Sequence, residues 1–95
     1  MIHNMNLNNE PFELIKSGSK TIELRLNDEK RRLLNIGDEI LFNNRSNNEK
    51  LLVSIIDLHK YDSFKSLYKD FDKVSLGYKE DEERYGVVGI ELKLK

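Results

Sequence analysis

The chain has 95 residues, of which 38% are hydrophobic and 35% are charged, and its formal net charge is −1. This length predicts one domain over residues 1–95, with enough apolar residues for a single compact core. The near-neutral charge argues against a general nucleic-acid binder, because such proteins are typically basic, so any contact with RNA must use a local patch or a small pocket.

The sequence gives few signals of location or of bound cofactors. Its apolar runs are only a few residues long, so no segment is predicted to span a bilayer, and its N-terminus lacks the features of a signal peptide. We therefore expect a cytoplasmic protein. The absence of cysteine and the presence of only two histidines, His3 and His59, argue against disulfides, thiol nucleophiles and the common zinc sites. We expect no cofactor and no metal, although a hard-cation site made of carboxylates stays open.

In chain order, the pattern first predicts a short strand over residues 2–7 and then a helix over residues 9–17. Asn8 or Asn9 can cap this helix, Pro11 suits its first turn, and Gly18 occupies the position of a helix-ending glycine. Further elements follow as a strand over 20–26, a helical turn over 28–34, a turn at 37–38, a strand over 39–42, a polar hairpin loop over 43–48 and a strand over 51–59.

The last third of the chain predicts one more helix and one more strand. Ser63 is typical of a helix cap, and apolar residues follow it at helical spacing as far as residue 71. Residues 74–83 end in an acidic run, and residues 86–94 alternate as a closing strand. About five strands and two or three short helices predict an α+β domain, built as a small curled sheet or a partly closed barrel.

Residues 18–25 stand out because they carry three charged groups, Lys20, Glu23 and Arg25, within six residues. The strand period places Glu23 and Arg25 on one face, roughly 7 Å apart, as a rigid base for a polar pocket. A merely solvated strand face is the common alternative. The opposite face should hold the strand to the core through its apolar residues, Ile22, Leu24 and Leu26.

The spacing G-x-K-x-x-E-x-R in residues 18–25 is the signature of the ASCH domain, and the chain resembles that family of the wider PUA-like fold. The resemblance covers nearly the whole chain. Further matching stretches are Met5-x-Leu7-x-x-Glu10-Pro11-Phe12, Asp28-Glu29-Lys30-Arg31, Ile36-Gly37-Asp38 and Arg84-Tyr85-Gly86-Val87-Val88-Gly89-Ile90-Glu91.

This resemblance implies a PUA-like five-stranded β-barrel with two or three short flanking helices, and a cleft lined by the signature residues. Family members are thought to bind RNA. Some relatives are amidohydrolases of N(4)-acetylcytidine, and others are reported as ribonucleases. Lys20 matches the nucleophile or base of the amidohydrolases, but they carry a threonine where this chain has Glu23. Their later catalytic glutamate has no secure match here, and the candidates are Glu80, Glu82 and Glu83.

The residue types of the signature suit binding more simply than catalysis. Paired with Glu23, a charged Lys20 would be a poor nucleophile but a good ligand for a phosphate or a carbonyl. Arg25 suits a phosphate or a base edge, and Glu23 can accept a hydrogen bond from an exocyclic amine. Tyr85 can stack on a base, although a half-buried residue at the start of a strand is the commoner role. Lys30, Arg31 and Arg32 form a compact basic cluster, which is either a solvated helix face or an extension of a phosphate track from Arg25.

Three hypotheses follow from these residues. The first is a domain that binds RNA or a modified nucleoside through Lys20, Glu23, Arg25 and Tyr85. The second is a hydrolase, acting on a modified cytidine or on RNA, with Lys20 and Glu23 as its catalytic residues. The third is a protein-interaction or regulatory domain, which the near-neutral charge favours. The sequence leaves the oligomeric state open, and His59 is expected to make a structural hydrogen bond rather than to act in catalysis.

Overall fold

The computed structural model describes residues 1–61 and 86–95, and these fold into one sheet with a short helix beside it. The elements in chain order are β1 (Ile2–Leu7), α1 (Asn9–Lys16), β2 (Ile22–Leu26), the 3-10 helix η1 (Arg31–Leu33), β3 (Glu39–Asn44), β4 (Lys50–Tyr61) and β5 (Val87–Leu94). The sheet has the strand order β1-β3-β4-β5-β2, in which β1 and β3 are parallel and the other neighbours are antiparallel.

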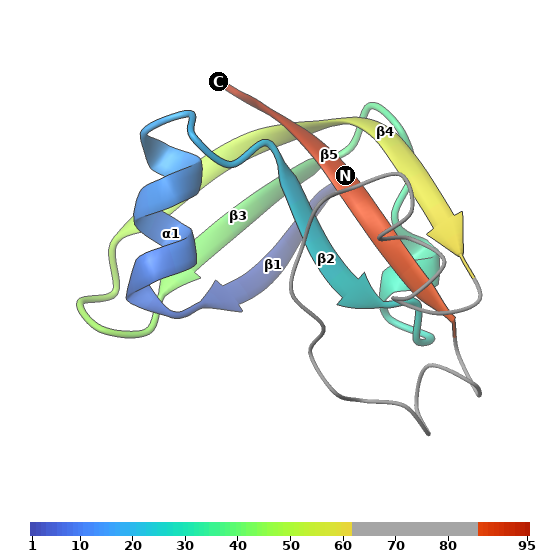
Figure 1. The fold of residues 1–95 in the computed structure, drawn as a ribbon, viewed down its shortest axis with the longest axis horizontal. Helices are drawn as coiled ribbons and strands as arrows, with labels where there is room; N and C mark the ends of the chain where they lie inside the picture. Colours follow the sequence, from blue (N-terminus) through green and yellow to red (C-terminus); the bar gives the residue numbers. More distant parts are fainter. Residues whose placement is uncertain (62–85) are drawn as a thin grey trace.

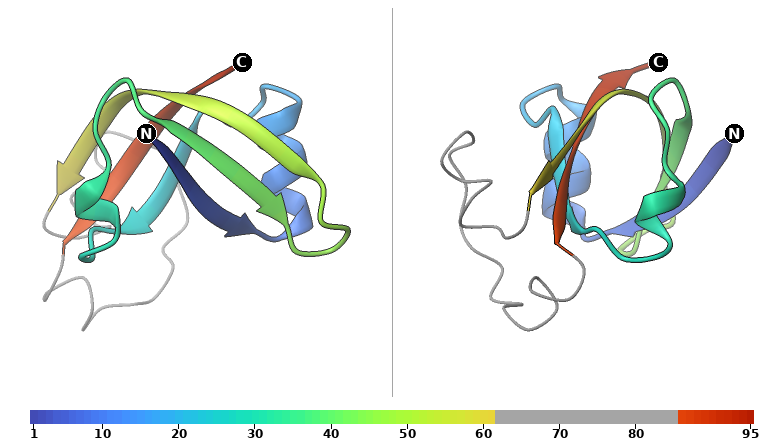
Figure 2. Two further views of the ribbon diagram at one scale, coloured as in Figure 1. Left: turned by 180° about the vertical axis from the view of Figure 1, so that it is seen from behind. Right: turned by 90° about the vertical axis from the view of Figure 1, so that its right-hand side faces the viewer.

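The sheet curls into a half-barrel with β1 and β2 at its two edges, and α1 lies across one end (Figures 1 and 2). The predicted α+β class and the five strands are confirmed. The predicted two or three helices are not, since the described residues contain one α-helix and one short 3-10 helix, and the helix predicted from Ser63 lies outside them. Within the described residues β1 and β2 do not pair, so the barrel is open along one side. No helix in this part of the chain is long and apolar enough to cross a membrane.

The core fills the inside of the curl. Strand β3 buries alternate residues along its whole length, β1 does so at Met5 and Leu7, and β4 does so at Val53 and Ile55, as a period of two requires. Helix α1 adds Phe12 and Ile15 to the same core, which closes one end of the half-barrel. The core residues are Met5, Leu7, Phe12, Ile15, Leu34, Ile40, Phe42, Val53, Ile55, Val88, Ile90 and Leu92.

Strand β5 is buried on both of its faces. Val88 and Ile90 pack in the main core, whereas Val87 points to the opposite face. An apolar side chain on the neighbouring strand β2 therefore has a packing partner on either side of β5. The second, smaller apolar cluster consists of Val87 with the partly buried Leu24, Leu26 and Tyr61.

The register between β2 and β5 places the signature residues on the core side. Glu23 lies opposite Ile90 and Arg25 lies opposite Val88, and residues directly opposite one another project from the same face of a sheet. The prediction that the apolar residues of β2 mark the core face was therefore wrong. Leu24 and its apolar neighbours on β2 are only half-buried, while Glu23 is 5% exposed, because β5 offers apolar surface on its outer face as well.

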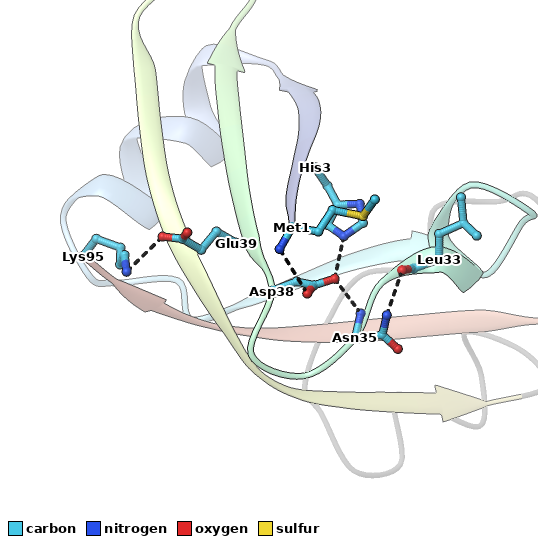
Figure 3. Close-up of polar contacts among 7 residues, drawn as sticks. All are labelled: Met1, His3, Leu33, Asn35, Asp38, Glu39 and Lys95. Carbon is cyan, nitrogen blue, oxygen red and sulfur yellow. Dashed lines mark hydrogen bonds and ion pairs between the residues drawn. The ribbon is translucent and has the colours of Figure 1, made fainter.

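Asp38, in the turn before β3, fixes the start of the parallel pair β1 and β3 (Figure 3). Its Oδ2 accepts hydrogen bonds from His3 Nε2 at 2.8 Å and from the main-chain N of Asn35 at 3.3 Å, and its Oδ1 lies 3.6 Å from the amino group of Met1. These contacts hold the pKa of Asp38 below its ordinary value of 3.8, chiefly through the hydrogen bond from His3. Parallel strands have no hairpin to set their register, and here the carboxylate of Asp38 connects the start of β3 to the start of β1.

Replacing Phe12 by alanine should lower the free energy of unfolding by about 3–5 kcal/mol, because the ring is fully buried where α1 closes the half-barrel. Leu14→Ala is the matched control, since Leu14 is on the same helix but 41% exposed, and it should cost less than about 1 kcal/mol. Urea unfolding followed by circular dichroism measures both values. Equal losses in the two variants would contradict the packing of α1 described above.

Asp38→Asn should make the protein less stable at neutral pH. It should also reduce the loss of stability that occurs as the pH is lowered. A carboxyl group with a lowered pKa stabilises the fold above its unfolded-state pKa, and this contribution is lost as the pH falls through the folded-state value. The stability difference between the parent protein and the variant should therefore be constant down to about pH 4 and should shrink below it. Urea midpoints measured from pH 2 to pH 7 test this, and a difference that persists unchanged at pH 2 would contradict it.

Candidate functional site

The turn after α1 brings Lys20 to the start of β2. Gly18 has a φ of +83°, a left-handed conformation that favours glycine, and it ends the helix as the sequence predicted. The main-chain N of Gly18 donates to the oxygen of Ile15 at 3.0 Å, and that of Lys20 donates to the oxygen of Leu14 at 3.0 Å. The backbone around Lys20 is therefore tied to the helix rather than left to the loop.

Lys20, Glu23 and Arg25 meet around one buried carboxylate, and we call these three residues the signature cluster. Lys20 Nζ donates to Glu23 Oε1 at 2.8 Å, and Arg25 Nε donates to Glu23 Oε2 at 3.0 Å, with Arg25 Nη2 at 2.9 Å from the same oxygen. The side chain of Glu23 is 7% exposed, while those of Lys20 and Arg25 are 19% and 21% exposed. Both oxygens of Glu23 are thus occupied by cations, as a buried carboxylate requires.

Arg25 also bridges the open side of the half-barrel. Its Nη2 donates to the main-chain oxygen of Asn6 at 2.9 Å, and Asn6 belongs to β1, the opposite edge of the sheet. One guanidinium therefore joins Glu23 on β2 to the backbone of β1, where no strand pairing links the two described edges. The planar fork of arginine allows these simultaneous contacts, which the single ammonium of lysine does not.

Arg31 lies close enough to Arg25 for the two charges to repel. Burial, followed by the charge of Arg25, lowers the pKa of Arg31 below its ordinary value, and the carboxylates of Asp28 and Glu23 only partly offset this. Arg31 Nη1 is 4.0 Å from Asp28 Oδ1, which is a long ion pair. Arg25 is paired with Glu23, but among the described residues Arg31 has only this long ion pair, so positive charge remains beside Arg25 and favours the approach of an anion.

A groove of about 320 Å³ opens beside Arg25 and Arg31, and we call it the basic groove. Its lining contains five cationic residues, and none of the described residues that line it is a carboxylate. The uncharged part of the lining comes from β1 and β3. The lining residues are Asn4, Met5, Asn6, Arg25, Lys30, Arg31, Leu41, Asn43, Arg45 and Lys50.

The structure brings some of the predicted site residues together and adds others. Lys20, Glu23 and Arg25 are in contact, whereas Tyr85 lies outside the described residues, as do the glutamates considered as a second catalytic group. Lys30 and Arg31 line the same groove as Arg25. Arg32 is directed elsewhere, since its Nε donates to the main-chain oxygen of Asn27 at 2.8 Å.

Sequence reasoning missed the cations at the β3–β4 turn. Arg45 and Lys50 stand on either side of that turn and line the basic groove. The sequence analysis treated the segment as a polar hairpin loop. The signal that was available is the pair of cations flanking a run of neutral polar residues, but its meaning depends on β1 lying beside β3, which no local pattern reveals.

In the described part of the chain, one group of residues that could hold a metal ion lies on β4 and β5, and none of its members lines the basic groove. Ligand atoms of Asp57, His59 and Glu91 all lie within 4.8 Å of one another. A register shift between Ile55 and Asp57 turns Asp57 to the same face as Glu91, which it pairs with. His59 Nε2 is 3.0 Å from Glu91 Oε1 and 3.7 Å from Asp57 Oδ2, so these contacts also form an ordinary histidine–carboxylate pairing between two strands, in line with the structural role expected for His59.

Comparison with known proteins identifies the family. A model of the ASCH domain matches residues 5–95, and the chain belongs to the ASCH domain family. No curated protein matches the sequence.

Solved structures agree with this assignment. The crystal structure of the hypothetical protein PH0355 shares 35% identity over the full length of both chains, with a TM-score of 0.85. The solution structure of protein PF0455 from Pyrococcus furiosus shares 34% identity over 99% of this chain and 97% of that chain, with a TM-score of 0.73. ASCH from Zymomonas mobilis has 15% identity over 97% of this chain and 66% of that chain, and its TM-score of 0.70 shows a common fold alone.

Glu23→Gln should lower the free energy of unfolding by about 2–3 kcal/mol, because it removes the charge that two half-buried cations share. Glu13→Gln on the exposed side of α1 is the control and should change stability by less than about 0.5 kcal/mol. Urea unfolding of the two variants and the parent protein gives the comparison. A loss below about 1 kcal/mol for Glu23→Gln would show that the signature cluster does not hold the edge of the sheet.

Proposed function

We propose that the chain acts as a single ASCH domain over residues 1–95 that binds RNA or a modified nucleoside, with ligand phosphate held in the basic groove. The observation that carries this proposal is the charge of the groove. Its described lining contains Arg25, Lys30, Arg31, Arg45 and Lys50 without a carboxylate, although the chain as a whole has 17 acidic and 16 basic residues. Such segregation creates a local positive potential in a chain of nearly neutral net charge.

Arg25 connects the signature cluster with the basic groove. Its Nε and Nη2 are engaged by Glu23 and by the main chain of Asn6, so the guanidinium is already oriented. Among the described residues none bonds to Nη1, and this nitrogen would face the ligand. A pre-oriented arginine loses little side-chain freedom when it binds a phosphate. The signature cluster would therefore act mainly by positioning Arg25 at the rim of the groove.

The contacts of Lys20 support binding rather than hydrolysis. Its ammonium donates to Glu23 at 2.8 Å, and an ammonium has no free electron pair with which to attack a carbonyl. Lys20 and Glu23 also stand outside the lining of the basic groove, so a phosphate held there does not touch them directly. Both residues suit the support of a binding surface.

Binding should depend on salt and on the cations of the groove. We expect a fluorescein-labelled single-stranded RNA of ten nucleotides to bind, and the logarithm of its association constant to fall linearly with the logarithm of the salt concentration. The double variant Lys30→Gln, Arg31→Gln should reduce the slope of this plot by about 1.4, because two phosphate contacts are lost and each contributes about 0.7 for a single strand. Fluorescence anisotropy titrations at several salt concentrations measure the slope.

The matched control replaces Lys93 and Lys95, which lie at the end of β5 and outside the groove, by glutamine. Its net charge equals that of the test variant, so an unchanged slope in the control separates local contact from net charge. The proposal fails if RNA does not bind, or if the two double variants weaken binding equally. Circular dichroism should show that both remain folded.

The hydrolase alternative gives a different result with N(4)-acetylcytidine. Under the binding proposal, chromatography of the incubated nucleoside should show no product with the parent protein or with Lys20→Ala. Turnover by the parent protein that disappears in folded Lys20→Ala would overturn the assignment and make Lys20 a catalytic residue. Turnover that is equal in both proteins would indicate a contaminant.

A further inference from the structure

A line of polar contacts starts at Arg25, at the open side of the half-barrel, and continues across the outer face of β1 and β3 to β4. Arg25 Nη2 donates to the main-chain oxygen of Asn6 at 2.9 Å, Asn43 Nδ2 donates to Asn6 Oδ1 at 3.2 Å, and Lys50 Nζ donates to Asn43 Oδ1. Asn6 lies opposite Asn43 in the parallel pair, and Asn43 lies opposite Lys50 in the hairpin. The line therefore joins a cation on β2 to a cation on β4 through two amides.

Each end of this line carries more than one cation. Arg25 is accompanied by Lys30 and Arg31 at the end formed by β2 and η1. Lys50 is accompanied by Arg45, which is held in place because its Nη1 donates to Asn8 Oδ1 at 3.1 Å. The basic groove thus carries positive charge at both of its ends, with neutral amides between them.

Two asparagine residues stand between the cation at one end of the line and the cation at the other. The backbones of β1 and β4 are separated by about 10 Å, because neighbouring strands lie about 4.8 Å apart. A single phosphate on Arg25 therefore leaves Lys50 and Arg45 unused. The middle of the groove offers amide donors and acceptors on Asn4 and Asn43, and an apolar contact on Leu41.

We infer that the ligand is a single strand of RNA that carries at least two phosphates. It runs from Arg25, at the open side of the half-barrel, across the outer face of β1 and β3 to Lys50 on β4. Its phosphates are neutralised at the two ends, and its riboses and base edges lie along the asparagine amides. An amide can both donate to and accept from a ribose 2′-hydroxyl, and the edges of unstacked bases are accessible only in a single strand. This inference rests on the proposed function and specifies its ligand.

The test compares ligands of increasing length against both ends of the groove. Uridine 5′-monophosphate and oligouridylates of two, four and six nucleotides are titrated into three proteins. These are the parent protein, the double variant Arg45→Gln, Lys50→Gln, which we call the groove variant, and the control double variant Lys93→Gln, Lys95→Gln. We expect affinity for the parent protein to rise at least tenfold between the monophosphate and the hexanucleotide. The groove variant should lose most of that rise, while the control keeps it.

The outcomes separate this inference from the proposed function. Equal affinity for the monophosphate and the hexanucleotide would overturn the inference alone, as would a length-dependent rise that survives in the groove variant. Absence of binding for every ligand would overturn the proposed function as well. Because Arg45 and Lys50 are both at the surface, urea unfolding is expected to confirm that the groove variant is folded. The single variant Lys50→Gln serves as a second test if the double variant is not folded.

Discussion

The carboxylate of Glu23, buried on the core side of an edge strand, is the constraint on which the signature region depends. A buried carboxylate is costly unless it is fully paired, and here both of its oxygens are occupied by Lys20 and Arg25. Arg25 then reaches the backbone of Asn6, so the charge that neutralises Glu23 also joins the two edges of the half-barrel. The contacts that stabilise the fold therefore also fix the positions of the signature residues, without any ligand.

This arrangement also explains why the neighbouring groove is positive. One carboxylate meets the guanidinium and ammonium groups of its two partners, and Arg31 adds a further charge whose own partner, Asp28, is 4.0 Å away. The surplus falls beside the outer face of β1 and β3, where the described lining adds Lys30, Arg45 and Lys50 and no carboxylate. A near-neutral chain therefore acquires a local anion-binding surface through the placement of its charges rather than through their number.

Local patterns were sufficient to predict the strands and the end of α1. The helix stop at Gly18 and the hairpin between β3 and β4 follow from conformational preferences that a few neighbouring residues express. The orientation of β2 was not predictable in this way, because its alternation is equally regular on both faces and the deciding factor is the apolar outer face of β5 at Val87. The contribution of Arg45 and Lys50 was likewise hidden, since it depends on the parallel pairing of β1 with β3, two strands separated by a helix and another strand.

The central claim is that RNA binds at the basic groove, and a nuclear magnetic resonance titration tests it most directly. Backbone amide signals of labelled protein would be followed while a hexanucleotide RNA is added. The account predicts that the largest shifts fall on residues of β1, β3 and the β3–β4 turn, together with Lys30 and Arg31. Shifts confined to the face of β4 and β5 that carries Asp57 and Glu91, or no shifts at all, would contradict it.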